Sequence, residues 1–86
     1  MWSDEQINDA VQMLWNASEK TDIQKVNSTD DKERKESYLV VNAVTYTDHV
    51  YVKALEKLVG DGKLIKDSEE DDRLTFRRAS EKVATR

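Results

Sequence analysis

Side chains able to bind phosphate groups or base edges gather around residues 47–57 of this 86-residue chain. If a helix there buries its leucines and Tyr51, steps of about 100° per residue place a different set on the opposite side. Lysines contact phosphates or guanine edges, and a threonine or histidine at a helix start reaches a base or a phosphate. Two lysines four residues apart are equally typical of a solvated helix face, so both interpretations stay open. The residues on that opposite side are His49, Val50, Lys53 and Lys57, and Thr47 lies near the start of the helix.

A second basic group, Arg73, Arg77 and Arg78, contains three of the chain's five arginines. From a β-hairpin these side chains can reach phosphates or a minor groove. Residues 69–72, directly before them, are all acidic and would be repelled by a phosphate backbone. Arginines that only neutralise the acidic run are therefore an equally good interpretation.

Other chemistry has little support in the residue types. The chain has no cysteine and one histidine, His49, so disulfides, a zinc site and a cysteine nucleophile are not expected. The acidic run lacks the alternating spacing and central glycine of a calcium loop. Two glycines are too few for a phosphate-binding glycine loop. We expect no catalytic residues, no metal and no cofactor.

Three aromatic residues, Trp2, Trp15 and Tyr46, are candidates for a protein interface, because exposed aromatic side chains often anchor such contacts. Trp15 also falls at the edge of an apolar helical stripe. Packing against the domain's own core is the favoured interpretation for that residue.

Length and charge bound the remaining possibilities. Eighty-six residues fit one domain over 1–86 with a thin core. A net charge of −4 argues against general affinity for phosphate backbones, although local basic clusters can override it. No apolar run is long enough to span a bilayer, and the acidic N-terminus does not fit a signal peptide. We therefore expect a cytoplasmic or otherwise intracellular protein without a membrane partner.

The first helix has the strongest local signal. Ser3 followed by Gln6 forms a capping box, and a helix should begin at Asp4. Its buried stripe has helical spacing and consists of Ile7, Ala10, Val11, Leu14 and either Ala17 or Ser18.

The middle of the chain is ambiguous. A polar loop or insertion is expected at about residues 20–35. The following apolar run, 38–44, has the β-branched content of a strand, whereas its charged lead-in favours a buried helix over about Asp31 to Ala43. We favour the helix and keep the strand as the alternative.

The later elements are clearer. A capped amphipathic helix is expected from about His49 to Val59, burying Tyr51, Ala54, Leu55 and Leu58. Gly60 and Gly62 should end it, because both fall where left-handed backbone is needed. Residues 64–67 and 73–78 then form a hairpin, and residues 80–86 form a frayed tail.

This order of elements resembles the winged helix-turn-helix superfamily. The likeness rests on residues 50–65, where Leu55, Leu58, Gly62, Leu64 and Ile65 match the pattern of a recognition helix that passes through a glycine turn into the first wing strand. It implies a small α+β winged-helix domain with about three helices and a C-terminal two-stranded wing.

The resemblance implies two alternative functions. The first is a double-stranded DNA-binding transcriptional regulator or accessory factor, acting as a homodimer on paired half-sites. The second is an acidic winged-helix module that binds another protein within a larger assembly.

Overall fold

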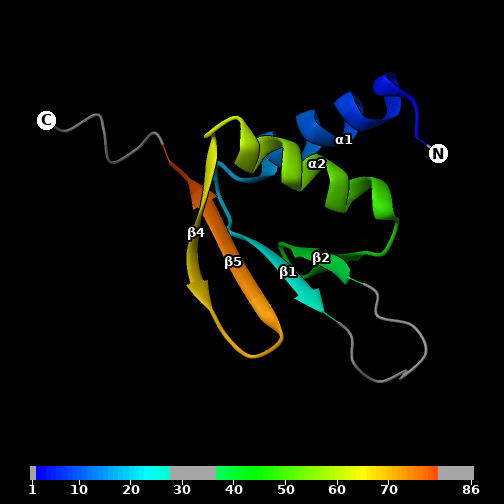
Figure 1. Cartoon of the computed structure of the whole chain (residues 1–86). Helices are drawn as coiled ribbons and strands as arrows, with labels where there is room; N and C mark the ends of the chain where they lie inside the picture. Colours follow the sequence, from blue (N-terminus) through cyan, green and yellow to red (C-terminus); the bar gives the residue numbers. More distant parts are fainter. Residues whose placement is uncertain (1, 28–36, 80–86) are drawn as a thin grey trace, which may run out of the picture.

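A computed structural model describes residues 2–27 and 37–79. These residues form a small α+β domain of two helices and one five-stranded antiparallel sheet, with strand order β3-β2-β1-β5-β4 (Figure 1). The helices are α1 (Asp4–Ala17) and α2 (His49–Gly60). The strands are β1 (Ile23–Asn27), β2 (Ser37–Val41), β3 (Val44–Tyr46), β4 (Leu64–Glu69) and β5 (Arg73–Arg78).

The start of α1 is as predicted. The Ser3 hydroxyl accepts a hydrogen bond from the Gln6 amide at 3.1 Å, and the Gln6 side chain accepts one from the Ser3 amide at 2.9 Å. The predicted stripe faces inward, with Ala10, Leu14 and Ser18 buried and its other members partly buried.

The glycine turn after α2 depends on Gly62 alone. Gly62 has φ +79°, and the amide of the following Lys63 donates a 3.0 Å hydrogen bond to the Leu58 carbonyl. Gly60 is the last residue of α2 and does not have a positive φ, so the expectation that both glycines adopt left-handed backbone is wrong for it. The helix therefore ends one residue later than predicted.

The middle of the chain differs from the prediction. Residues 37–41 form β2, so the favoured helix over Asp31 to Ala43 is wrong there and the strand alternative is confirmed. Residues 23–27, expected within the polar loop, form β1. The rest of that loop from residue 28, the start of the expected helix and the tail at 80–86 lie outside the described residues.

Strand β1 lies in the centre of the sheet although it contains few apolar residues. It pairs with β2 on one side, where Ile23 is opposite Val41, and with β5 on the other, where Ile23 is opposite Phe76. Its backbone groups are thus used on both sides, and Ile23 is completely buried. The β4–β5 hairpin is confirmed and extends to Glu69 with a bulge at Asp67.

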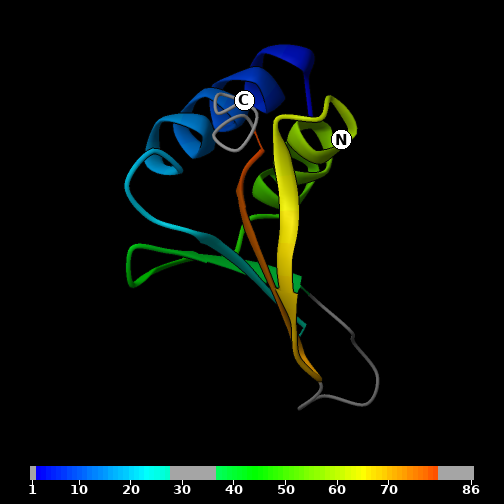
Figure 2. The same cartoon turned by 90° about the vertical axis from the view of Figure 1, so that its left-hand side faces the viewer.

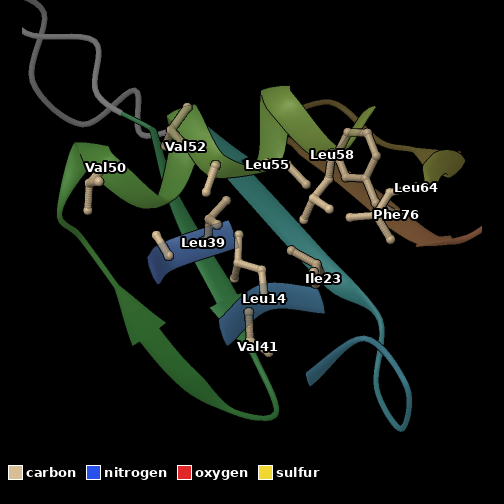
Figure 3. Packing of buried hydrophobic residues seen from close by; sticks show 12 residues of the cluster. Leu14, Ile23, Leu39, Val41, Val50, Val52, Leu55, Leu58, Leu64 and Phe76 are labelled. Carbon is tan, nitrogen blue, oxygen red and sulfur yellow. The ribbon is translucent and has the colours of Figure 1, made fainter. Parts of the chain in front are cut away.

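Both helices pack on one face of the sheet, and the core lies between these layers. Side chains from α1, α2 and alternate positions of four strands meet there, as Figure 3 shows. The two views show the helices side by side at one end of the domain, with the β4–β5 turn extending away from them (Figures 1 and 2). The largest fully buried side chains are Leu14, Ile23, Leu39, Leu55, Leu58 and Leu64.

The opposite face of the sheet, which we call the outer face, is covered by neither helix. Cross-strand register assigns residues to it, because directly opposed residues share a face and neighbours alternate. Val26, opposite both Tyr38 and Arg73, is 5% exposed yet does not belong to the core on the helix side. The outer face also includes Gln24, Val40, Thr45, Ile65, Thr75 and Arg77.

The turn between β2 and β3 is strained. Asn42 and Ala43 have φ 53° and φ 66°, the left-handed values of a type I′ hairpin turn. Asparagine tolerates this region, whereas alanine does so at a cost of about 1–2 kcal/mol. Glycine is the residue that this type of turn favours at the Ala43 position.

We therefore predict that Ala43→Gly raises the free energy of unfolding by about 1 kcal/mol, because it removes the left-handed strain. Urea denaturation followed by circular dichroism measures the change. Ala17→Gly, at the last residue of α1, serves as the control and should lower stability by up to about 1 kcal/mol. Loss of stability in both variants would show that Ala43 is not strained.

Candidate nucleic-acid interface

The candidate residues on α2 share one exposed face. His49, Lys53 and Lys57 are all exposed, and Thr47 is exposed just before the helix. The rest of the helix circumference is engaged, since α2 contacts α1, β2 and β4. The structure thus positions the three helical side chains by burying the opposite side of α2.

One residue assigned to that face lies elsewhere. Val50 is 8% exposed and belongs to the core, so its predicted exposure is wrong. Helix α2 packs against α1 as well as against the sheet, so its buried arc is wider than one partner would require. Val52, at 2% exposure, is buried for the same reason.

The sequence reasoning missed Glu56. This residue is exposed and lies three positions after Lys53 and one before Lys57, within the same strip. A helical projection of all charged residues, rather than of the cations alone, would have found it. The strip, which we call the α2 strip, therefore consists of His49, Lys53, Glu56 and Lys57, with one carboxylate among its cations, and the exposed Thr47 precedes it in the chain.

Arg77 is paired within the hairpin. Its Nε donates a 2.9 Å hydrogen bond to Oδ1 of Asp67, the bulged residue of β4, with both side chains about 40% exposed. This contact agrees with the alternative that the hairpin arginines neutralise nearby acids. An exposed pair of this kind contributes at most about 1 kcal/mol to stability, so it does not prevent Arg77 from changing partner.

Arg78 joins the end of β5 to the end of α1. Its guanidinium carbon lies 3.7 Å from the centroid of the Trp15 ring, and its Nε donates a 2.9 Å hydrogen bond to Ser18 Oγ. A second guanidinium nitrogen donates to the Trp15 carbonyl. The last turn of α1 has no basic residue of its own, so Arg78 supplies the cation that a helix C-terminus favours.

Arg73 is exposed at the start of β5, beside the acidic turn. The nearby Lys66 ammonium donates a 2.7 Å hydrogen bond to Glu69 and lowers the pKa of that carboxyl. The Glu69 carboxylate therefore stays negatively charged at a lower pH than an isolated glutamate would. Arg73 and Arg77 lie on the outer face, whereas α2 packs on the other face, so the two sets of predicted cations are not brought together.

The predicted interface aromatics are all partly buried against the core. Trp15 lies beneath Arg78, and the ring of Tyr46 lies 4.9 Å from that of Tyr51. Trp2 lines an open groove of about 270 Å³ between α1 and the start of α2, together with Asp9 and Asp48.

The described residues contain neither a candidate metal site nor a candidate membrane-spanning helix. Residues 2–27 and 37–79 contain no group of three or more histidine, aspartate or glutamate side chains placed to hold a metal ion. Neither helix is long and apolar enough to cross a membrane.

Comparison with known proteins gives no match to a protein-family model, a curated protein or a solved structure.

We predict that Arg78→Leu lowers the free energy of unfolding by about 2–3 kcal/mol, because it removes the stacking on Trp15 and two charge-assisted hydrogen bonds. Arg78→Lys should lose part of this amount, since an ammonium cannot reproduce the planar contacts. Urea titrations followed by tryptophan fluorescence measure both.

Arg73→Leu is the matched control, because it removes the same charge from an exposed site on the same strand and should change stability by less than about 0.5 kcal/mol. Equal stability of the Arg73 and Arg78 variants would exclude the proposed role of Arg78 at the end of α1.

Proposed function

We propose that this chain binds double-stranded DNA by placing the α2 strip in the major groove. The observation that carries the proposal is the exposure of His49, Lys53 and Lys57 on one side of a helix whose other sides are buried. A helix fixed in this way presents its cations with little loss of backbone conformational freedom on binding.

The dimensions of α2 suit this role. Its 12 residues span about 18 Å at 1.5 Å per residue, and the major groove is wide enough to admit such a helix. Recognition helices contact base edges mainly with their N-terminal residues. Thr47 and His49 occupy that end of α2, and the lysines follow along the same strip toward the phosphates.

The order α1, α2 and the β4–β5 hairpin supports a variant of the winged-helix fold. The β2–β3 hairpin occupies the place in the chain where a middle helix was expected. Such a variant retains the recognition helix and the wing, and residues 37–46 form a hairpin in place of the first helix of a helix-turn-helix pair. DNA contact would then depend on α2 itself, with Arg73 available from the wing.

The charge of the domain limits its affinity. Glu56 lies among the lysines and the turn after β4 is acidic, so few phosphates can be neutralised at once. The logarithm of the binding constant falls linearly with the logarithm of the salt concentration, with a slope of about −0.9 per phosphate contact. Because this domain makes few such contacts, its binding should depend on salt less steeply than that of a highly basic domain.

The test measures fluorescence anisotropy of a labelled random duplex over a range of salt concentrations. Wild-type protein should bind at low salt, and Lys53→Glu combined with Lys57→Glu should remove binding. The single Lys53→Ala change should weaken binding and lower the salt slope by about 1, since one phosphate contact is lost.

The control combines Lys20→Glu with Lys63→Glu, two exposed lysines outside α2 and away from the β4–β5 turn that give the same change in net charge. This variant should retain most of the wild-type binding. If it loses binding as completely as the α2 variant, total charge rather than the α2 strip governs the interaction. If wild-type protein does not bind at low salt, the DNA-binding proposal fails.

A second candidate function is a protein-interaction module, and the outer face favours it. Tyr38, Val40 and Ile65 are only partly buried on a sheet surface that neither helix covers. Apolar and aromatic side chains on such a surface are typical of a protein contact. The same titration separates the two functions, because an interaction module of this kind would show no DNA binding even at low salt.

A further inference from the structure

The two edges of the sheet differ in how they are protected. Edge strand β4 carries Lys66, Asp67 and Glu69 and is interrupted by a bulge. Charges and bulges on an edge discourage pairing with another strand. The other edge, β3, has the sequence Val-Thr-Tyr, contains no bulge and carries no charge.

The uncharged segment extends beyond β3. Residues 37–47 contain no Asp, Glu, Lys or Arg, although charged residues make up 37% of the chain. Among the described residues, two large hydrophobic side chains are exposed, Val44 at 49% and Val59 at 38%, and Val44 is the more exposed of them. This edge therefore combines unusual neutrality with exposed apolar surface.

The backbone of Thr45 is oriented for pairing. In a two-residue type I′ hairpin the flanking residues, Val41 and Val44, form the hydrogen-bonded pair. The next pair, Val40 and Thr45, is then the non-hydrogen-bonded one. Consequently the N–H and C=O groups of Thr45 point away from β2, toward the open edge.

We propose that β3 pairs antiparallel with β3 of a second copy of this chain, on a twofold axis that passes between the two Thr45 residues. In this arrangement Thr45 is opposite its own equivalent, and Val44 is opposite Tyr46 of the second copy. Threonine pairs and aromatic pairs with β-branched residues are among the stabilising cross-strand pairs. The two five-stranded sheets become one continuous sheet.

Charge selects a second copy as the occupant. The domain has a net charge of −4, so self-association through most of its surface brings like charges together. A twofold contact is also isologous and sets each residue against the same patch of the other copy. A neutral edge meets this requirement without repulsion, whereas the β4 edge has a net negative charge, because Asp67 and Glu69 outweigh Lys66.

The dimer proposal does not depend on DNA binding by α2. If α2 does bind DNA, the dimer would fix the position of one α2 strip relative to the other. Helix α2 begins at His49, shortly after β3 ends at Tyr46. The two α2 N-termini would therefore flank the twofold axis. Paired half-sites are the DNA targets that suit such symmetry.

Analytical ultracentrifugation from micromolar to millimolar protein, without DNA, tests the proposal. Because the contact is short, we expect a weak, reversible dimer in the wild type. Thr45→Lys places two like charges opposite each other on the axis and should raise the dissociation constant at least tenfold. Ser68→Lys is the matched control, since it adds the same charge to an exposed outer-face position on β4 and should leave association unchanged.

A charge exchange tests the axis itself. Thr45→Glu alone should also weaken association, and an equimolar mixture of the Thr45→Lys and Thr45→Glu proteins should restore it, because opposite charges then meet. Circular dichroism checks that every variant is folded. A wild type that stays monomeric throughout, or a mixture that associates no better than its components, would overturn the proposal.

The Lys53→Glu and Lys57→Glu double variant should dimerise like the wild type. Loss of DNA binding with intact dimerisation in this variant would separate the two proposals. Loss of dimerisation with intact DNA binding in the Thr45 variants would also separate them.

Discussion

The packing of α2 against both α1 and the sheet is the constraint on which the rest of this structure depends. Val50, Val52, Ala54, Leu55 and Leu58 are buried on the helix, so most of its circumference is committed to the interior. What remains exposed is a narrow strip, and that strip carries the cations. Core packing and surface chemistry are therefore fixed by the same few turns, because rotation of α2 would expose apolar residues and bury lysines together.

Local patterns predicted the elements whose signals lie within a few residues. The capping box at Ser3 and Gln6, the helical stripe of α1 and the glycine turn at Gly62 each depend on short-range geometry, and each is present. The hairpin of β4 and β5 was also recognisable. The prediction failed for strand β1, whose partner β5 is distant in sequence. Its only apolar residues are Ile23 and Val26, so its sequence is typical of a loop, and the strand forms because β2 and β5 pair with it.

The β2–β3 hairpin was hidden for a related reason. A type I′ turn is usually recognised from Asn-Gly, and here the dipeptide is Asn42-Ala43, so the usual signal for a tight hairpin was absent.

In the candidate site, too, local features were predicted and contacts between distant residues were not. Spacing along α2 predicted the exposure of Lys53 and Lys57, but nothing near Arg78 in sequence indicates that it stacks on Trp15.

The position of β5 between β1 and β4 has a consequence for how the chain reaches its native state. β5 is the last strand in the described part of the chain, yet it completes the hydrogen bonding of the central strand β1. During synthesis β1 can meet β2 early, but its other side stays open until residue 78 has left the ribosome. Closing so long a loop is entropically unfavourable, so docking of the β4–β5 hairpin onto β1 is expected to be the slow step.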